Sequence, residues 1–168
     1  MGLVCDRFAL YLPHVIAPGT SPSSLTAKRE ALLAQLGAFQ HSQARLQWLV
    51  EQARSRSSLL AEFKVEAHRV PGCLANLWLL ADVRDGYCHF ECDSDSHIVR
   101  AVAGLLCEFY SGAAPADILA LSPDFLEEVG INQHLTANRR NVLSRVWERI
   151  RDFAQAQQAA NVTPSARA

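Results

Sequence analysis

Apolar residues recur with helical spacing in three long stretches of the chain, and these stretches predict its main helices. The first covers residues 26–54, and Ser42 within it is a candidate N-cap that divides it into two helices. The second covers residues 96–111 and is apolar on nearly every side, so we expect it to be the central buried helix. The last opens at Thr136. Its apolar stripe consists of Val142 or Leu143, Val146, Ile150 and Phe153.

A β-hairpin is predicted between the first and second of these stretches. Residues 74–83 are too apolar for a half-exposed strand, which favours a strand in the interior of a sheet. Asp85-Gly86 is a two-residue turn signal, and residues 87–92 follow it as a second strand. Asp93-Ser94-Asp95 is then expected to cap the central helix. Helices combined with a small antiparallel sheet predict an α+β fold.

The ends of the chain differ in pattern from its middle. Residues 1–24 have no periodicity and contain "APGTSPSS", which is typical of a linker, so we expect a disordered extension. Residues 156–168 are expected to form a flexible tail. These assignments leave residues 25–155 as one folded domain.

Composition narrows the classes of function. The chain has 168 residues, a net charge of −1 and no apolar run near the roughly 20 residues that span a bilayer. We therefore expect no nucleic-acid partner and no membrane partner, since both favour basic surfaces. Five cysteines without a signal-peptide pattern indicate reduced thiols and a cytoplasmic location.

One cysteine stands out by its position in the chain. Cys73 follows Pro71-Gly72, a tight-turn signal, and directly precedes the apolar strand. A turn braced by a strand can present a thiol to another molecule, but free cysteine is also among the most buried residue types. The spacing alone leaves both interpretations open. His68 and Arg69 precede the turn, either as charges that stabilise a thiolate or as solvated loop residues.

The remaining cysteines include one pair with the sequence spacing of possible metal ligands. Cys88 and Cys92 form a C-x3-C pair beside His89, but residues four apart on a strand are separated by about 13 Å, too far for one metal ion. We expect no metal site, and core packing for these two residues and for Cys107.

Four sequence blocks, in order and with similar gaps, resemble the SufE family of sulfur acceptors in iron–sulfur metabolism. They are "RVPGC" with the "LWLL" strand, "DSDSHIV", "FYSGAAPADIL" and "GINQHLTANRRNVL". The resemblance implies that Cys73 carries a cysteine persulfide intermediate and that His134 and Arg139 lie near it in supporting roles. It also implies a fold similar to SufE and IscU proteins, with about three antiparallel strands. The third would lie between Phe63 and His68.

The resemblance further implies a carrier without enzymatic turnover of its own. Its partner would be a cysteine desulfurase of the SufS or CsdA type, which it would activate and which would hold the pyridoxal phosphate. This chain would need no cofactor. It would then pass the sulfur to an iron–sulfur scaffold complex. An apolar pocket near Leu74, Leu77 and Trp78 would shelter the persulfide.

Two alternatives come from other classes of protein. An iron–sulfur scaffold of the IscU kind needs about three converging thiolates and an acidic residue after the first cysteine. Here Leu74 follows Cys73, and no Cys-x-x-His pair follows Cys107. A thiol redox protein usually has a resolving cysteine close to the reactive one, and Cys73 has none nearby in sequence. Both comparisons favour the carrier.

Overall fold

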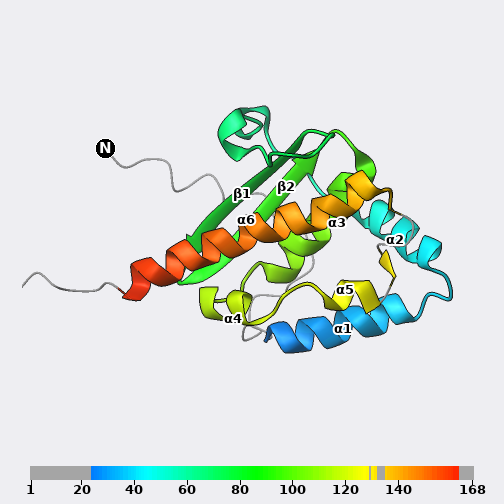
Figure 1. The fold of residues 1–168 in the computed structure, drawn as a ribbon, viewed down its shortest axis with the longest axis horizontal. Helices are drawn as coiled ribbons and strands as arrows, with labels where there is room; N and C mark the ends of the chain where they lie inside the picture. Colours follow the sequence, from blue (N-terminus) through cyan, green and yellow to red (C-terminus); the bar gives the residue numbers. More distant parts are fainter. Residues whose placement is uncertain (1–23, 129, 132–134, 163–168) are drawn as a thin grey trace, which may run out of the picture.

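A computed structural model describes residues 24–128, 130–131 and 135–162 (Figure 1). Their elements form an α+β fold, as predicted. The elements in chain order are α1 (Leu25–Gly37), α2 (Ser42–Ser55), the short 3-10 helices η2 (Ala61–Phe63) and η3 (Glu66–His68), β1 (Leu77–Arg84), β2 (Tyr87–Ser94), α3 (His97–Tyr110), α4 (Pro115–Ala120), α5 (Phe125–Glu128) and α6 (Ala137–Val162).

The predicted hairpin is present. β1 and β2 pair antiparallel, and the two turn residues Asp85 and Gly86 have φ of 53° and 85°. Positive φ at both positions is what a two-residue turn needs to match the twist of its strands. β1 begins at Leu77, three residues later than predicted, because the residues after Cys73 belong to the loop that precedes the strand.

The predicted third strand between Phe63 and His68 is wrong. The described residues form a two-stranded sheet, and the segment in question folds into η2 and η3. The backbone N–H groups of His68 and Arg69 donate to the carbonyls of Val65 and Glu66, so these donors close local turns and do not join a ladder. What remains of a third strand is an isolated bridge between Arg69 and Trp78.

Helix α3 is the centre of the core, as its apolar sequence predicts. It packs on β2, α2 and α6, and most of its side chains are buried. Its N-cap is Ser96, whose hydroxyl accepts a hydrogen bond from the Val99 N–H. The expected cap of Asp93-Ser94-Asp95 is wrong in part, because β2 continues through Asp93 to Ser94.

The division of residues 26–54 into two helices is confirmed. The first ends at Gly37 and the second begins at Ser42. The N-cap position is occupied by His41, one residue before the predicted cap.

Helix α6 crosses in front of the sheet and α3 in Figure 1. The predicted stripe is confirmed, since Val142, Leu143, Val146 and Ile150 are buried and Phe153 is partly buried against the core. The helix continues to Val162, so the predicted boundary at residue 155 is too early. Residues 156–160 are glutamines and alanines, which form helix readily even where most side chains are exposed.

Several predictions for the chain ends fall outside the described residues. These are the predicted extension over residues 1–24, apart from residue 24, and the last part of the tail, residues 163–168. Within the described part of the chain, no helix has both the length and the apolar character required to cross a membrane.

Candidate functional site

Cys73 lies in an exposed loop whose two ends are fixed in the core. Pro71 and Gly72 are exposed, and Gly72 adopts φ of +77°, in the region that favours glycine. Val70 and Leu77, which flank the loop, are fully buried, and the Val70 N–H donates to the Leu77 carbonyl over 2.8 Å. The loop is therefore held at its base while its turn faces solvent.

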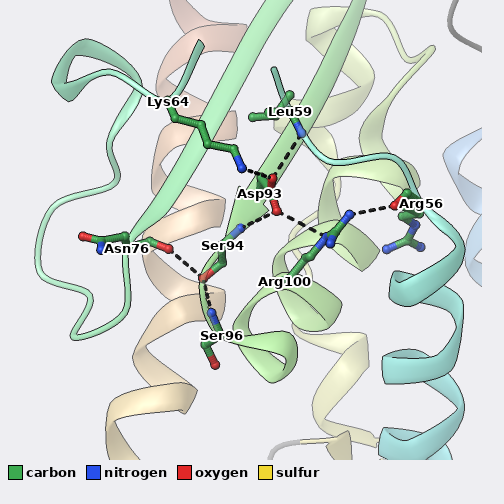
Figure 2. Close-up of polar contacts among 8 residues, drawn as sticks. All are labelled: Arg56, Leu59, Lys64, Asn76, Asp93, Ser94, Ser96 and Arg100. Atoms are coloured by element: carbon green, nitrogen blue, oxygen red, sulfur yellow. Dashed lines mark hydrogen bonds and ion pairs between the residues drawn. The ribbon is translucent and has the colours of Figure 1, made fainter. Parts of the chain in front are cut away.

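The second half of the loop is fixed by a polar network at Asn76. Arg69 Nη2 donates to Asn76 Oδ1 over 2.8 Å, and Asn76 Nδ2 donates to Asp95 Oδ2 over 2.8 Å. The Asn76 carbonyl accepts from the Ser94 hydroxyl over 2.7 Å, as Figure 2 shows. This network joins the loop to the end of β2, so the position of Cys73 depends on the sheet.

Beside this network, at the residue before Ser94, lies a buried carboxylate, Asp93, with a side chain only 3% exposed. Its Oδ2 pairs with Lys64 Nζ at 2.8 Å and accepts a hydrogen bond from the Leu59 N–H over 3.1 Å. Its Oδ1 lies 3.3 Å from Arg100 Nε (Figure 2). Burial alone would raise the pKa of Asp93, but hydrogen bonds from Lys64 and the Ser94 N–H, with the charges of Arg100 and Lys64, outweigh it and lower the pKa below its usual value. Asp93 thus attaches the η2 segment to the sheet.

The thiol of Cys73 is half-buried against the core, and two opposing effects act on it. Burial raises the pKa of Cys73, and the positive charge of Arg145 on α6 lowers it, with burial the larger effect. At neutral pH the sulfur of the free protein is therefore mostly a thiol. Leu74, which follows it, is 84% exposed. The predicted apolar shelter is thus wrong at Leu74, whereas Leu77 is buried as a part of the core.

Arg145 is the charged residue that sequence reasoning missed. A β-carbon placed on Gly72 would lie 3.3 Å from Arg145 Nε, so the guanidinium group lies against the Cys73 turn. The helical stripe of α6 places Arg145 beside the buried positions. Which loop faces that part of the helix is set by tertiary packing and gives no signal in the sequence.

The two predicted supporting residues are not tested. His134 lies outside the described residues, and Arg139 belongs to the first turn of α6 with a side chain that is also outside them. His68 Nδ1 lies 2.8 Å from the Phe63 carbonyl, and Arg69 bonds Asn76 and Glu66. The structure therefore gives His68 and Arg69 roles in holding the loop.

The remaining described cysteines lie away from the turn, in β2 and α3. Cys88 and Cys107 are buried core residues, as predicted, and Cys92 is half-buried. Burial raises the pKa of Cys88 to about 11. A hydrogen bond with Cys92, together with complete burial, raises the pKa of Cys107. Among the described residues, no group of three or more His, Cys, Asp or Glu side chains could hold a metal ion.

A groove of about 410 Å³ runs along β1 between η2, η3 and α6. Phe63, His68, Arg149 and Phe153 contribute to its walls, together with strand residues of both charge signs. Cys73 does not line it, so the groove and the loop are separate features.

Comparison with known proteins adds an independent line of evidence. The family model for SufE, the Fe-S metabolism associated domain, matches residues 30–154. A SufE-like protein of Synechocystis sp. is 27% identical over 85% of this chain and 88% of its own. The sulfur acceptor protein CsdE of Escherichia coli is 28% identical over 77% of this chain and 89% of its own.

A solved structure has a similar fold. The solution structure of a hypothetical protein from Thermus thermophilus is similar to this one, with a TM-score of 0.65 over 79% of this chain and 96% of the other, at 24% identity. The family match covers most of the chain and includes the Cys73 loop, the sheet and the buried helix α3. This chain belongs to the SufE family of Fe-S metabolism associated domains.

Proposed function

We propose that this protein is a sulfur acceptor in iron–sulfur metabolism, with Cys73 as the residue that carries the sulfur. The observation that supports this most is the position of Cys73, which lies half-buried on an exposed turn held at its base by the core. Membership of the SufE family and similarity to a protein named sulfur acceptor protein are consistent with it. The chain would act as a carrier without turnover of its own, in the reducing cytoplasm.

The transfer is an exchange at sulfur that needs no oxidant. A partner cysteine desulfurase, whose pyridoxal phosphate removes sulfur from cysteine, holds that sulfur as a persulfide. The Cys73 thiolate attacks the terminal sulfur, a new S–S bond forms at Cys73, and the partner's S–S bond breaks. The partner's cysteine leaves as a thiolate, which restores the desulfurase. Cys73 then holds the persulfide and delivers it to an iron–sulfur scaffold complex.

Leu74 provides a contact for docking. Its side chain is 84% exposed beside the reacting residue, so an approaching partner would remove a large apolar area from water. Burying a leucine contributes about 2 kcal/mol, which corresponds to more than tenfold in affinity. Docking would also change the surroundings of the Cys73 thiol, which burial keeps protonated in the free protein.

The other described cysteines favour the acceptor over its two rivals. Cys88 and Cys107 are fixed in the core, and the Cys92 thiol is hydrogen-bonded to that of Cys107. A scaffold would require several of these thiolates to converge with Cys73, and a disulfide-exchange protein would require one of them as a resolving partner. Their places in β2 and α3 are explained by packing.

Stimulation of a desulfurase tests the proposed partnership. Alanine formed from cysteine by a desulfurase should rise and saturate as this protein is added. Leu74→Asp should raise the concentration for half-maximal stimulation about tenfold, because a charge replaces the apolar contact. Val83→Asp is the matched control, since Val83 is also exposed but lies near the far end of β1. Absence of stimulation, or an equal loss in both variants, would contradict the proposal.

A further inference from the structure

The guanidinium group of Arg145 packs directly on the turn that carries Cys73. A β-carbon on Gly72 would lie 3.3 Å from Nε and 3.5 Å from both Cζ and Nη2 of Arg145. Glycine at position 72 therefore has two functions, since it allows the positive φ of the turn and leaves room for this side chain. A β-carbon there would require the guanidinium group to shift by a few tenths of an ångström.

The guanidinium group contacts an acidic side chain as well as the turn. Nη1 lies 3.3 Å from Glu148 Oε2, one turn further along α6, and both side chains are about half exposed. Nε and Nη2 lie on the side of the Cys73 turn. Glu148 thus holds the group from one side, and the positive charge of the group lies against the loop.

The other described charges near the loop are engaged elsewhere. Arg69 bonds Asn76 and Glu66, and Asp95 bonds both the backbone and the side-chain nitrogen of Asn76. Among the residues whose side chains the structure describes, Arg145 is the charged group whose field acts on the Cys73 sulfur, where it opposes the effect of burial. Because an arginine stays protonated, it acts on sulfur as a fixed charge and not as a base.

We propose that Arg145 is a positioning residue that stabilises the anionic sulfur of Cys73, first as the thiolate and then as the terminal sulfur of the persulfide. The second half of this statement rests on the proposed function. Before transfer, the guanidinium group favours the attacking thiolate in a site whose burial disfavours it. After transfer, the negative charge lies one sulfur further out, and the flat, many-donor group can follow it.

The pH profile of Cys73 alkylation tests this proposal without a desulfurase. Iodoacetamide reacts with the thiolate, so the rate on the Cys73 peptide, followed by mass spectrometry, reports the thiolate fraction. In Arg145→Gln the midpoint should move to higher pH by about half a unit to one unit, and the rate at pH 7.5 should fall about three- to tenfold. Arg145→Lys should retain most of the effect, since the charge remains.

Arg151→Gln is the matched control. Arg151 is on the same helix, is also 48% exposed and also lies 3.3 Å from an acidic partner, Asp152. Its removal should leave the Cys73 profile unchanged. An unchanged midpoint in Arg145→Gln, or an equal shift in Arg151→Gln, would overturn the proposal.

Sulfur transfer to Arg145→Gln separates this proposal from the proposed function. Transfer from a desulfurase should be slow at pH 7.5 and recover at higher pH, where the thiolate forms without help. If the alkylation profile of Arg145→Gln is shifted but the wild-type protein accepts no sulfur, the thiolate role is supported, while the proposed function and the persulfide role are contradicted. Normal transfer with an unshifted profile would overturn the role of Arg145 alone.

Discussion

Replacing Cys73 with serine (Cys73→Ser) is expected to abolish sulfur acceptance and desulfurase stimulation while leaving the fold unchanged. A serine hydroxyl has nearly the same shape, but it does not ionise near neutral pH and forms no S–S bond. Cys73 is only half-buried on a solvent-facing turn, so we expect a change in unfolding free energy within about 0.5 kcal/mol. Transfer of ³⁵S from labelled cysteine, together with urea unfolding, measures both quantities.

Cys92→Ser is the control for this variant, because Cys92 is also a half-buried free cysteine. It should accept label as the wild type does, although the hydrogen bond to Cys107 changes. Label retained by Cys73→Ser and lost in Cys92→Ser would show that the acceptor is Cys92 on β2 and not Cys73.

The second large effect is expected at Asp93, where Asp93→Asn should lower the unfolding free energy by about 3 kcal/mol. Removing one member of a buried ionic network leaves its partners unpaired, which commonly costs about 3–5 kcal/mol. We expect the lower end of this range because the Lys64 side chain is 31% exposed, so its charge can reach water when Asp93 is lost. The Arg100 side chain is only 16% exposed, so its charge stays largely buried. Denaturant unfolding at pH 7 measures the loss.

The pH dependence of stability provides a second signature of Asp93. Its pKa is lowered in the folded protein, so its contribution is fully present above its unfolded pKa of about 3.9 and is lost as pH falls through the folded value. The difference in stability between wild type and Asp93→Asn should therefore be constant between about pH 5 and 7 and shrink in stronger acid.

Asp82→Asn is the matched control for the loss of a carboxylate. Asp82 pairs with Arg84 at 2.9 Å, but its side chain is 48% exposed, so the pair is solvated. Such surface pairs contribute about 0–1 kcal/mol. Equal losses in Asp82→Asn and Asp93→Asn would show that the buried network adds no more than a surface pair.

Much of the fold was predictable because its signals are local. Asp85-Gly86 specifies the hairpin through backbone conformations that the two turn residues adopt readily, and the structure has that turn. The apolar character of residues 96–111 on nearly every side required a helix enclosed by other elements, and α3 is that helix. Cys73 could be singled out by its turn because Pro71-Gly72 also acts locally.

The errors arose where contacts between distant segments decide the outcome. The segment from Phe63 to His68 was predicted as a strand, but it closes two local turns and is attached to β2 through Lys64 and Asp93. Asp93 itself was assigned to a helix cap, since nothing in the sequence shows that Lys64 and Arg100 converge on it. Arg145 lies 72 residues after Cys73 in the chain, and only the packing of α6 over the loop brings the two together.

Peptide mapping after a single round of transfer tests the central claim most directly. The wild-type protein, incubated with a desulfurase and cysteine and then alkylated under conditions that preserve persulfides, should gain about 32 Da, the mass of one sulfur atom. The account predicts that this mass is found on the peptide containing Cys73 and on no other cysteine peptide. Added sulfur on the peptides of Cys88, Cys92 or Cys107, with Cys73 unmodified, would contradict it.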